Sequence, residues 1–161
     1  MGKYFGTDGF RGEANVNLTA MHAFKVGRFL GWYYGRFHKC SVVIGKDTRR
    51  SSYMFEDALS AGLTSTGADV YLLHVTTTPS VSYVVRTEDF DCGIMISASH
   101  NPYYDNGIKL INGNGEKMEQ EVIDKVEEYL DGDFDDVPYA TMDKIGRTID
   151  YFAGRNRYMG Y

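Results

Sequence analysis

Short apolar runs alternate with longer amphipathic stretches along most of the chain. Three apolar runs have the length of buried strands: 41–45, 70–75 and 92–97. Four longer stretches place apolar residues at helical spacing: 19–38, 52–66, 80–86 and 118–130. Buried strands that alternate with helices are typical of a parallel sheet with helices on both faces. We therefore predict an α/β fold, a three-layer α/β/α sandwich with a mainly parallel mixed sheet.

Single residues mark several of the expected element boundaries. Thr19 is placed to cap the first helix, and Gly67 is placed to end the second. Pro79 fits the first turn of the third helix, where no hydrogen-bond donor is lost. A return strand over 108–111 is expected to run antiparallel to its neighbour, and a last strand is expected over 144–149.

A polar loop follows the third apolar run. Ser97, Ser99, His100 and Asn101 lie within five positions, and Lys109 follows on the return strand. A hydroxyl, an imidazole, an amide and an ammonium group in one loop are suited to binding an oxyanion. Serine and asparagine are also common in turns, so such a loop alone is more often a turn than a site.

A second polar segment, residues 3–12, carries three glycines together with Thr7, Asp8 and Arg11. It has too little apolar periodicity for a helix, so we expect an ordered loop. Glycine lets the backbone approach a ligand closely, and the planar guanidinium of Arg11 is suited to phosphate. By itself, however, this composition is more typical of a surface loop than of a phosphate site.

Arg49 and Arg50 follow the apolar run 41–45. Ligands of α/β proteins gather at the carboxyl ends of the strands, so these arginines could set the local potential or orient the loop after Ser97. Pairing with acidic neighbours is the simpler interpretation for at least one of them.

Composition narrows the functional classes. The 161 residues include 17 basic and 22 acidic side chains, and a net charge of −5 argues against a broad nucleic-acid surface. No run is long enough to span a membrane, and the first residues do not resemble a signal peptide, so a cytoplasmic location is expected. Cys40 and Cys92 are interpreted as reduced thiols in or near the core. The acidic run 131–136 has Asp136 where a calcium loop needs glycine, so no metal is assigned to it.

The order of residues in both polar segments resembles one family. Residues 97–102, S-A-S-H-N-P, with D-N-G-I-K at 105–109, are similar to the phosphoserine loop of the α-D-phosphohexomutases. Residues 5–12, F-G-T-D-G-F-R-G, are similar to the opening signature of the same enzymes. Within this family, residues 103–107 are most similar to the phosphoglucosamine mutase branch. In the N-terminal motif, that branch often has isoleucine where this chain has Phe10.

The resemblance implies roles for individual residues. It places the phosphoserine on Ser99 rather than on Ser97, and Arg11 within reach of it. Lys109 and Arg11 become candidates for acid–base and electrostatic assistance, and His100 for orienting the loop. Three further residues are expected to support the loop: Thr7, Asp8 and Asn101.

The implied reaction interconverts glucosamine 6-phosphate and glucosamine 1-phosphate. Phosphorylated Ser99 gives its phosphoryl group to the sugar phosphate, and a bisphosphate intermediate later returns the other group. The family binds one Mg²⁺ through a phosphoryl oxygen of the phosphoserine together with carboxylates of its second domain. The implied partners are therefore a phosphosugar substrate and the remaining mutase domains.

The resemblance covers only the first of the family's four domains. Residues 1–150 are expected to form domain I, and residues 151–161 to begin the connection to a second domain. A polypeptide of this length is therefore expected to be inactive alone. Two alternatives remain open: the first domain of a phosphomannomutase or phosphoglucomutase, or a non-catalytic module that self-associates through its aromatic C-terminal segment.

Overall fold

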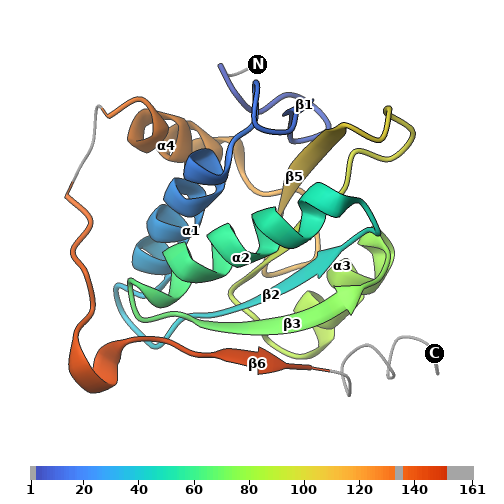
Figure 1. Ribbon diagram of the computed structural model, residues 1–161. Helices are drawn as coiled ribbons and strands as arrows, with labels where there is room; N and C mark the ends of the chain where they lie inside the picture. The colour runs from blue at the N-terminus through green and yellow to red at the C-terminus, as the bar shows by residue number, and fades with distance from the viewer. Residues whose placement is uncertain (1–2, 133–135, 152–161) are drawn as a thin grey trace.

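The computed structural model describes residues 3–132 and 136–151 and shows an α/β domain within them (Figure 1). The strands are β1 Phe10–Glu13, β2 Ser41–Lys46, β3 Asp69–Val75, β4 Cys92–Ile96, β5 Asp105–Asn112 and β6 Thr148–Asp150. The helices are α1 Ala20–Tyr34, α2 Arg50–Thr64, α3 Thr78–Thr87 and α4 Gln120–Leu130, with a 3₁₀ turn at Met142–Lys144.

One mixed sheet organises the fold, with the strand order β1-β5-β4-β2-β3-β6. Strands β4, β2, β3 and β6 pair in parallel, whereas β5 is antiparallel to both β4 and β1. The mainly parallel mixed sheet and the antiparallel return strand are therefore confirmed.

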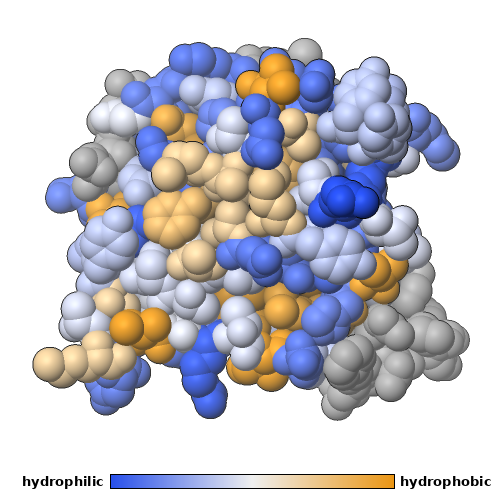
Figure 2. Space-filling view, in the orientation of Figure 1, coloured by the Kyte–Doolittle hydropathy of each residue, from blue (hydrophilic) through white to orange (hydrophobic). Residues whose placement is uncertain are grey.

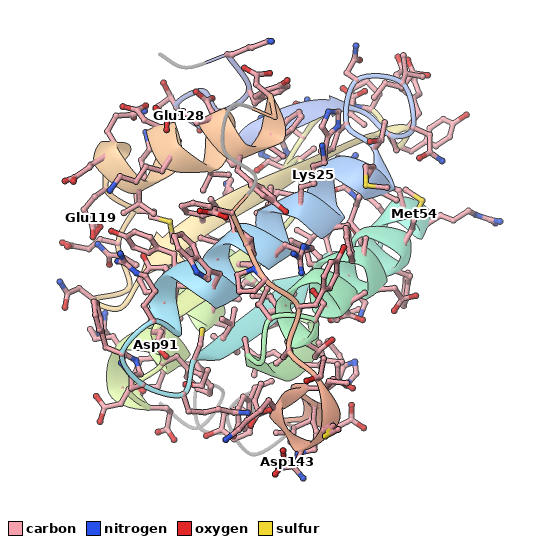
Figure 3. The ribbon with its side chains drawn as sticks, turned by 90° about the vertical axis from the view of Figure 1, so that its left-hand side faces the viewer. Lys25, Met54, Asp91, Glu119, Glu128 and Asp143 are labelled. Carbon is pink, nitrogen blue, oxygen red and sulfur yellow. The ribbon has the colours of Figure 1, made fainter. Side chains whose placement is uncertain are left out.

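Helices cover both faces of the sheet. The larger core lies under α1, α2 and α4, and a smaller core lies under α3 on the opposite face. Seen from the side, α4, α1 and α2 lie next to one another over the sheet (Figure 3). A hydrophobic area lies over α1 and α2 in the middle of the face that Figure 2 shows, surrounded by hydrophilic side chains. The predicted three-layer α/β/α architecture is confirmed.

Several element boundaries differ from the sequence prediction. The first helix ends at Tyr34, although the helical spacing extended over 19–38, and Phe37 beyond its end is 87% exposed. The last strand was expected over 144–149 but begins at Thr148. Lys144 belongs to the 3₁₀ turn Met142–Lys144. The expected helix over 152–161 and part of the acidic run, residues 133–135, lie outside the described residues.

The sequence predicted an ordered loop over residues 3–12, but the structure shows that only part of this segment is a loop. Its end forms β1, which pairs Phe10 with Ile108 and Arg11 with Gly107 at the edge of the sheet. Backbone pairing with β5 fixes this short strand, and such pairing leaves no periodic pattern in the sequence.

The two cysteines and the lengths of the described helices can both be compared with the expectations from the sequence. Cys40 and Cys92 are free and buried, and burial raises the pKa of both thiols. No helix in residues 3–132 or 136–151 is long and apolar enough to cross a membrane.

Helices α1 and α2 approach so closely that their contact has room only for glycine. A Cβ added to Gly62 would lie 2.1 Å from the carbonyl oxygen of Phe24, and one added to Gly27 would lie 2.5 Å from that of Leu59. Backbone atoms cannot move aside as side chains do, so each glycine sets the distance between the helices.

We predict that Gly62→Ala destabilises the domain by about 2 kcal/mol, because overpacking outweighs the gain of about 1 kcal/mol in helix propensity. Urea unfolding measures the change. Asp57→Ala, an exposed change in the same helix, is the control and is expected to leave stability nearly unaltered. A Gly62→Ala protein more stable than the wild type would contradict the close contact.

The start of α1 depends on a neutral histidine. The Thr19 hydroxyl accepts a hydrogen bond from the His22 amide at 3.2 Å, and the Thr19 amide donates to His22 Nδ1 at 3.1 Å. This reciprocal capping box requires an unprotonated Nδ1. Burial, with a smaller effect from the charge of Lys25, lowers the pKa of His22 below its ordinary value of 6.5.

We expect stability to fall as the pH drops below 6.5 and through the folded-state pKa of His22, because the unfolded chain binds the proton first. Urea unfolding between about pH 8 and about pH 5 measures this slope. His22→Gln keeps an acceptor for the Thr19 amide without titrating, so part of the slope should disappear. Identical slopes in the two proteins would rule out this role for His22.

Candidate active site

The candidate site lies at β2, where successive strands of the chain begin to be added on the opposite side of the sheet. The connection from β2 leads to β3 on one side, whereas β4 lies on the other side of β2. The carboxyl ends of β2 and β4 meet there, and the Asp47 amide donates to the carbonyl of Ile96 at 3.0 Å. Ligands of open α/β sheets bind at such a position. The loop after β4 projects from this edge.

Ser99 has an unusual backbone conformation in this loop. Its φ of +53° lies in the left-handed region, which serine rarely adopts. Its amide donates to the Ser97 hydroxyl at 3.1 Å, so Ser97 caps the backbone at the strand end. Ser97 is buried, whereas Ser99 is exposed.

Arg11 reaches the loop from β1. Its Nη2 donates to Ser99 Oγ at 3.3 Å, and its Nη1 donates to Asn101 Oδ1 at 3.4 Å. Its Nε is buried and has no hydrogen-bond partner among the residues that the structure describes. Gly107, opposite Arg11 in the sheet, makes room for the side chain, since an added Cβ would lie 3.0 Å from Arg11 Cγ and 2.6 Å from the carbonyl oxygen of Ser97.

Arg49 holds the backbone of the same loop. Its Nη1 donates to the carbonyl oxygens of Pro102 at 2.6 Å and Asp105 at 3.0 Å. Its Nη2 donates to those of Ser99 at 2.9 Å and Asn101 at 3.1 Å. The sequence left open whether Arg49 orients this loop or pairs with an acidic neighbour, and in the structure it does both.

The acidic neighbour is Asp47 at the end of β2. Its carboxylate accepts hydrogen bonds from Arg49 Nε at 2.9 Å, from the Arg49 amide at 3.0 Å and from the Ser52 hydroxyl at 2.6 Å. Asn106, fully buried on β5, donates to the Ser52 hydroxyl at 3.0 Å. Three elements are thus tied together beneath the loop.

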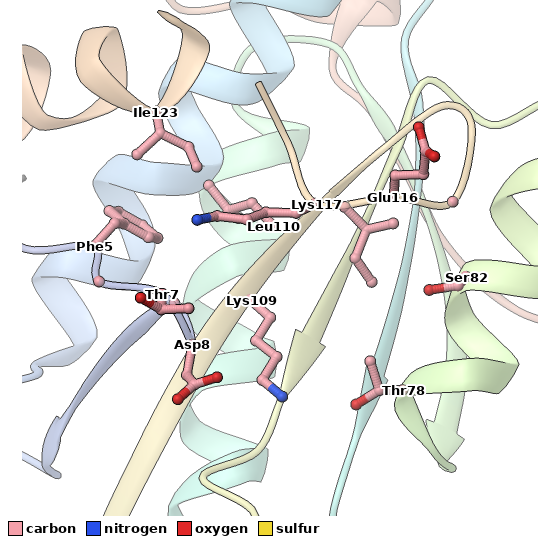
Figure 4. A pocket seen from close by; sticks show the side chains of 14 residues that line it. Phe5, Thr7, Asp8, Thr78, Ser82, Lys109, Leu110, Glu116, Lys117 and Ile123 are labelled. Carbon is pink, nitrogen blue, oxygen red and sulfur yellow. The ribbon is translucent and has the colours of Figure 1, made fainter. Parts of the chain in front are cut away.

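Lys109 lies in a neighbouring cavity of about 190 Å³. Its side chain leaves β5 on the face opposite to Ile108 and shares the cavity with Thr7, Asp8 and Thr78 (Figure 4). The Asp8 carboxylate and the Lys109 ammonium group point into the same part of this cavity, although no ion pair joins them. Ser99 and Arg11 do not line it.

The other predicted site residues differ in how firmly they are held. Asn101 is well connected, because its Nδ2 also donates to the Asp105 carboxylate at 3.2 Å. His100 is exposed and makes no side-chain hydrogen bond to any residue in the described part of the chain. The loop contacts expected of His100 are therefore made by Arg49.

Lys46 is a further cation beneath the loop, but its charge is already balanced. It is 2% exposed, and its ammonium group lies 2.9 Å from a carboxylate oxygen of Glu56, which is itself 6% exposed. Burial without a partner would be costly for either charge. The pair therefore links β2 to α2 and does not leave a positive charge available for a ligand.

The fold and the site define an α/β/α domain that presents a serine loop at the switch point of its sheet. The model of "Phosphoglucomutase/phosphomannomutase, alpha/beta/alpha domain I" matches residues 2–135. The chain belongs to this family, so the family resemblance seen in the sequence is confirmed.

Proteins similar to this chain carry names from the same family. A phosphoglucosamine mutase of Lachnospira eligens is 76% identical over the whole chain, and one of Lachnoclostridium phytofermentans is 70% identical. The chain spans 36% of the length of each. A crystal structure of a family protein from Burkholderia thailandensis, 22% identical, has the same fold, with a TM-score of 0.76 over 96% of this chain and 34% of that one.

We predict that removing one member of the buried Lys46–Glu56 pair costs about 3–5 kcal/mol, because the other charge stays buried alone. Lys46→Met and Glu56→Leu test this by urea unfolding. The double variant should recover most of the loss. Lys125→Met, in an exposed pair with Glu121, is the control and should cost about 0.5 kcal/mol. Additive losses in the double variant would contradict a direct interaction.

Proposed function

We propose that this chain forms the first domain of a phosphoglucosamine mutase, which interconverts glucosamine 6-phosphate and glucosamine 1-phosphate through a phosphoserine at Ser99. The names of the similar proteins support this substrate more than mannose or glucose phosphates. Because the chain spans 36% of the length of these relatives, the reaction is proposed for the assembled protein, with a phosphosugar and the remaining domains as partners.

The hydrogen bonding of Arg11 is the observation that carries this proposal. Hydrogen bonds from an N–H group to an oxygen are usually 2.7–3.2 Å long. The bonds of Arg11 to Ser99 and Asn101 are 3.3 and 3.4 Å long, and its Nε has no partner within residues 3–132 or 136–151. A phosphoryl group on Ser99 carries a charge of about −1.5 to −2 and three acceptor oxygens, which would satisfy these donors.

The surroundings of the two serines support Ser99 as the nucleophile. The Ser97 hydroxyl is buried and already accepts the Ser99 amide, whereas the Ser99 hydroxyl is at the surface of the loop. A sugar hydroxyl must approach the phosphorus in line with the bond that breaks. Only the exposed position gives a phosphosugar that access.

In the proposed transfer, the phosphoryl group leaves Ser99 for a hydroxyl group of the sugar, and the protons lost and gained are equal in number. The bond between phosphorus and Ser99 Oγ breaks, a bond to the sugar hydroxyl forms, the hydroxyl gives up its proton, and Ser99 Oγ takes one up. The bisphosphate then turns over and returns its other phosphoryl group to Ser99. We assign Arg11 and Lys109 to offsetting the charge on the transferred oxygens, and Lys109 to moving the proton.

The family resemblance also suggests Mg²⁺. The described residues contain no group of three His, Cys, Asp or Glu side chains that could hold a metal ion. A phosphoryl oxygen on Ser99 is a suitable hard ligand, but one ligand does not make a magnesium site. The described part of this chain therefore does not fit the whole site, and no step above depends on the metal.

We predict that phosphate from glucosamine 1,6-bisphosphate is found on Ser99. The test protein joins this chain to the remaining two thirds of the Lachnospira eligens relative, and intact mass with peptide mapping locates the phosphate. Ser99→Ala should abolish both labelling and turnover, whereas Ser97→Ala should keep the label on Ser99. Labelling of Ser97, or full turnover by Ser99→Ala, would overturn the assignment.

A further inference from the structure

We propose that Arg49 is a positioning residue, which holds Ser99 in its left-handed conformation so that the hydroxyl faces Arg11. The inference rests on the proposed function, since it concerns how the loop presents the phosphorylated serine. Arg49 contacts the loop backbone at four carbonyl groups and is anchored at Asp47, so it acts through the loop and not on the substrate.

The donors of Arg49 are fully used by these contacts. A guanidinium group has five N–H donors. Four donate to carbonyl oxygens of the loop, at 2.6 to 3.1 Å, and Nε donates to Asp47 at 2.9 Å. No donor remains for a phosphate, and the side chain is only 12% exposed. Arg11, in contrast, has longer bonds and an unpartnered Nε.

The backbone of Ser99 is held on both sides of its Cα. Its amide donates to the Ser97 hydroxyl, and its carbonyl accepts from Arg49 Nη2. A serine with φ of +53° is strained and persists only when its surroundings fix it. These two hydrogen bonds are therefore the contacts that keep the Ser99 side chain on the Arg11 side of the loop.

The anchor of Arg49 is rigid. Asp47 accepts from the side chain and the backbone of Arg49 and from Ser52 at the start of α2. Asn106 continues this connection to β5, which carries the other end of the loop. A lysine in place of Arg49 could keep the charge near Asp47, but its compact ammonium group cannot bridge four separate carbonyls.

The experiment compares Arg49→Lys and Arg49→Met with Arg50→Met in the same joined protein. Arg50 is an exposed neighbour with the same charge, so its loss controls for the change in local potential. We expect kcat to fall about a hundredfold for both Arg49 variants, because a small misplacement of the reacting group has an effect of this size. KM should change little, because Arg49 does not contact the substrate. Arg50→Met should keep kcat near the wild-type value.

Two further measurements separate positioning from simple stabilisation. A third variant, Arg49→Ala, leaves space for a small cation, and added guanidinium should restore part of its kcat while leaving the kcat of Arg50→Met unchanged. Urea unfolding should show Arg49→Lys still folded at the assay temperature. A wild-type protein without phosphate on Ser99 would defeat the proposed function itself. Normal phosphorylation with an unchanged kcat in Arg49→Lys would overturn the positioning role alone.

Discussion

The carbonyl groups of the loop between β4 and β5 set the central constraint on this structure. The loop follows neither a helix nor a sheet pattern, so its polar backbone needs partners from other parts of the chain. Arg49 satisfies four of these carbonyls with one planar side chain. Asp47 fixes that side chain to the end of β2, and the loop thereby takes one conformation although its outer residues face solvent.

The sheet supplies the framework on which this network depends. β4 enters the loop and β5 leaves it, and their antiparallel pairing from Cys92 with Asn112 to Ile96 with Ile108 fixes the two ends of the loop. β1 pairs with β5 beyond that point and brings Arg11 to the loop from the far N-terminal part of the chain. A serine and an arginine 88 positions apart meet because β5 pairs antiparallel with β4 on one side and with β1 on the other.

The sequence predicted the architecture well because the central strands of the sheet are short apolar runs, which are easily recognised. It also singled out Ser99 and Arg11, which the structure brings together, because both lie in motifs that resemble those of one family. It did not predict β1, whose position depends on backbone pairing with β5 rather than on side-chain pattern. The role of Arg49 stayed open because the main partners of its side chain are backbone carbonyls more than fifty positions away, and a carbonyl is the same in every residue. The assignment of residues 1–150 to domain I and of residues 151–161 to the start of a connection stays a prediction, as residues 152–161 lie outside the described part of the chain.

Hydrogen-bond accounting distinguishes the cations around the loop, which the sequence alone presents as similar. Lys46 is buried against Glu56 and is neutralised, whereas all five donors of Arg49 are used within the protein. Arg11 reaches Ser99 with one long bond, and neither its Nε nor the Lys109 ammonium group, which faces a cavity, has a hydrogen-bond or ion-pair partner in the described part of the chain. A chain with a net charge of −5 can thus keep a local positive potential at one loop, because the fold neutralises some of its cations and leaves others to face the position where an anion would form.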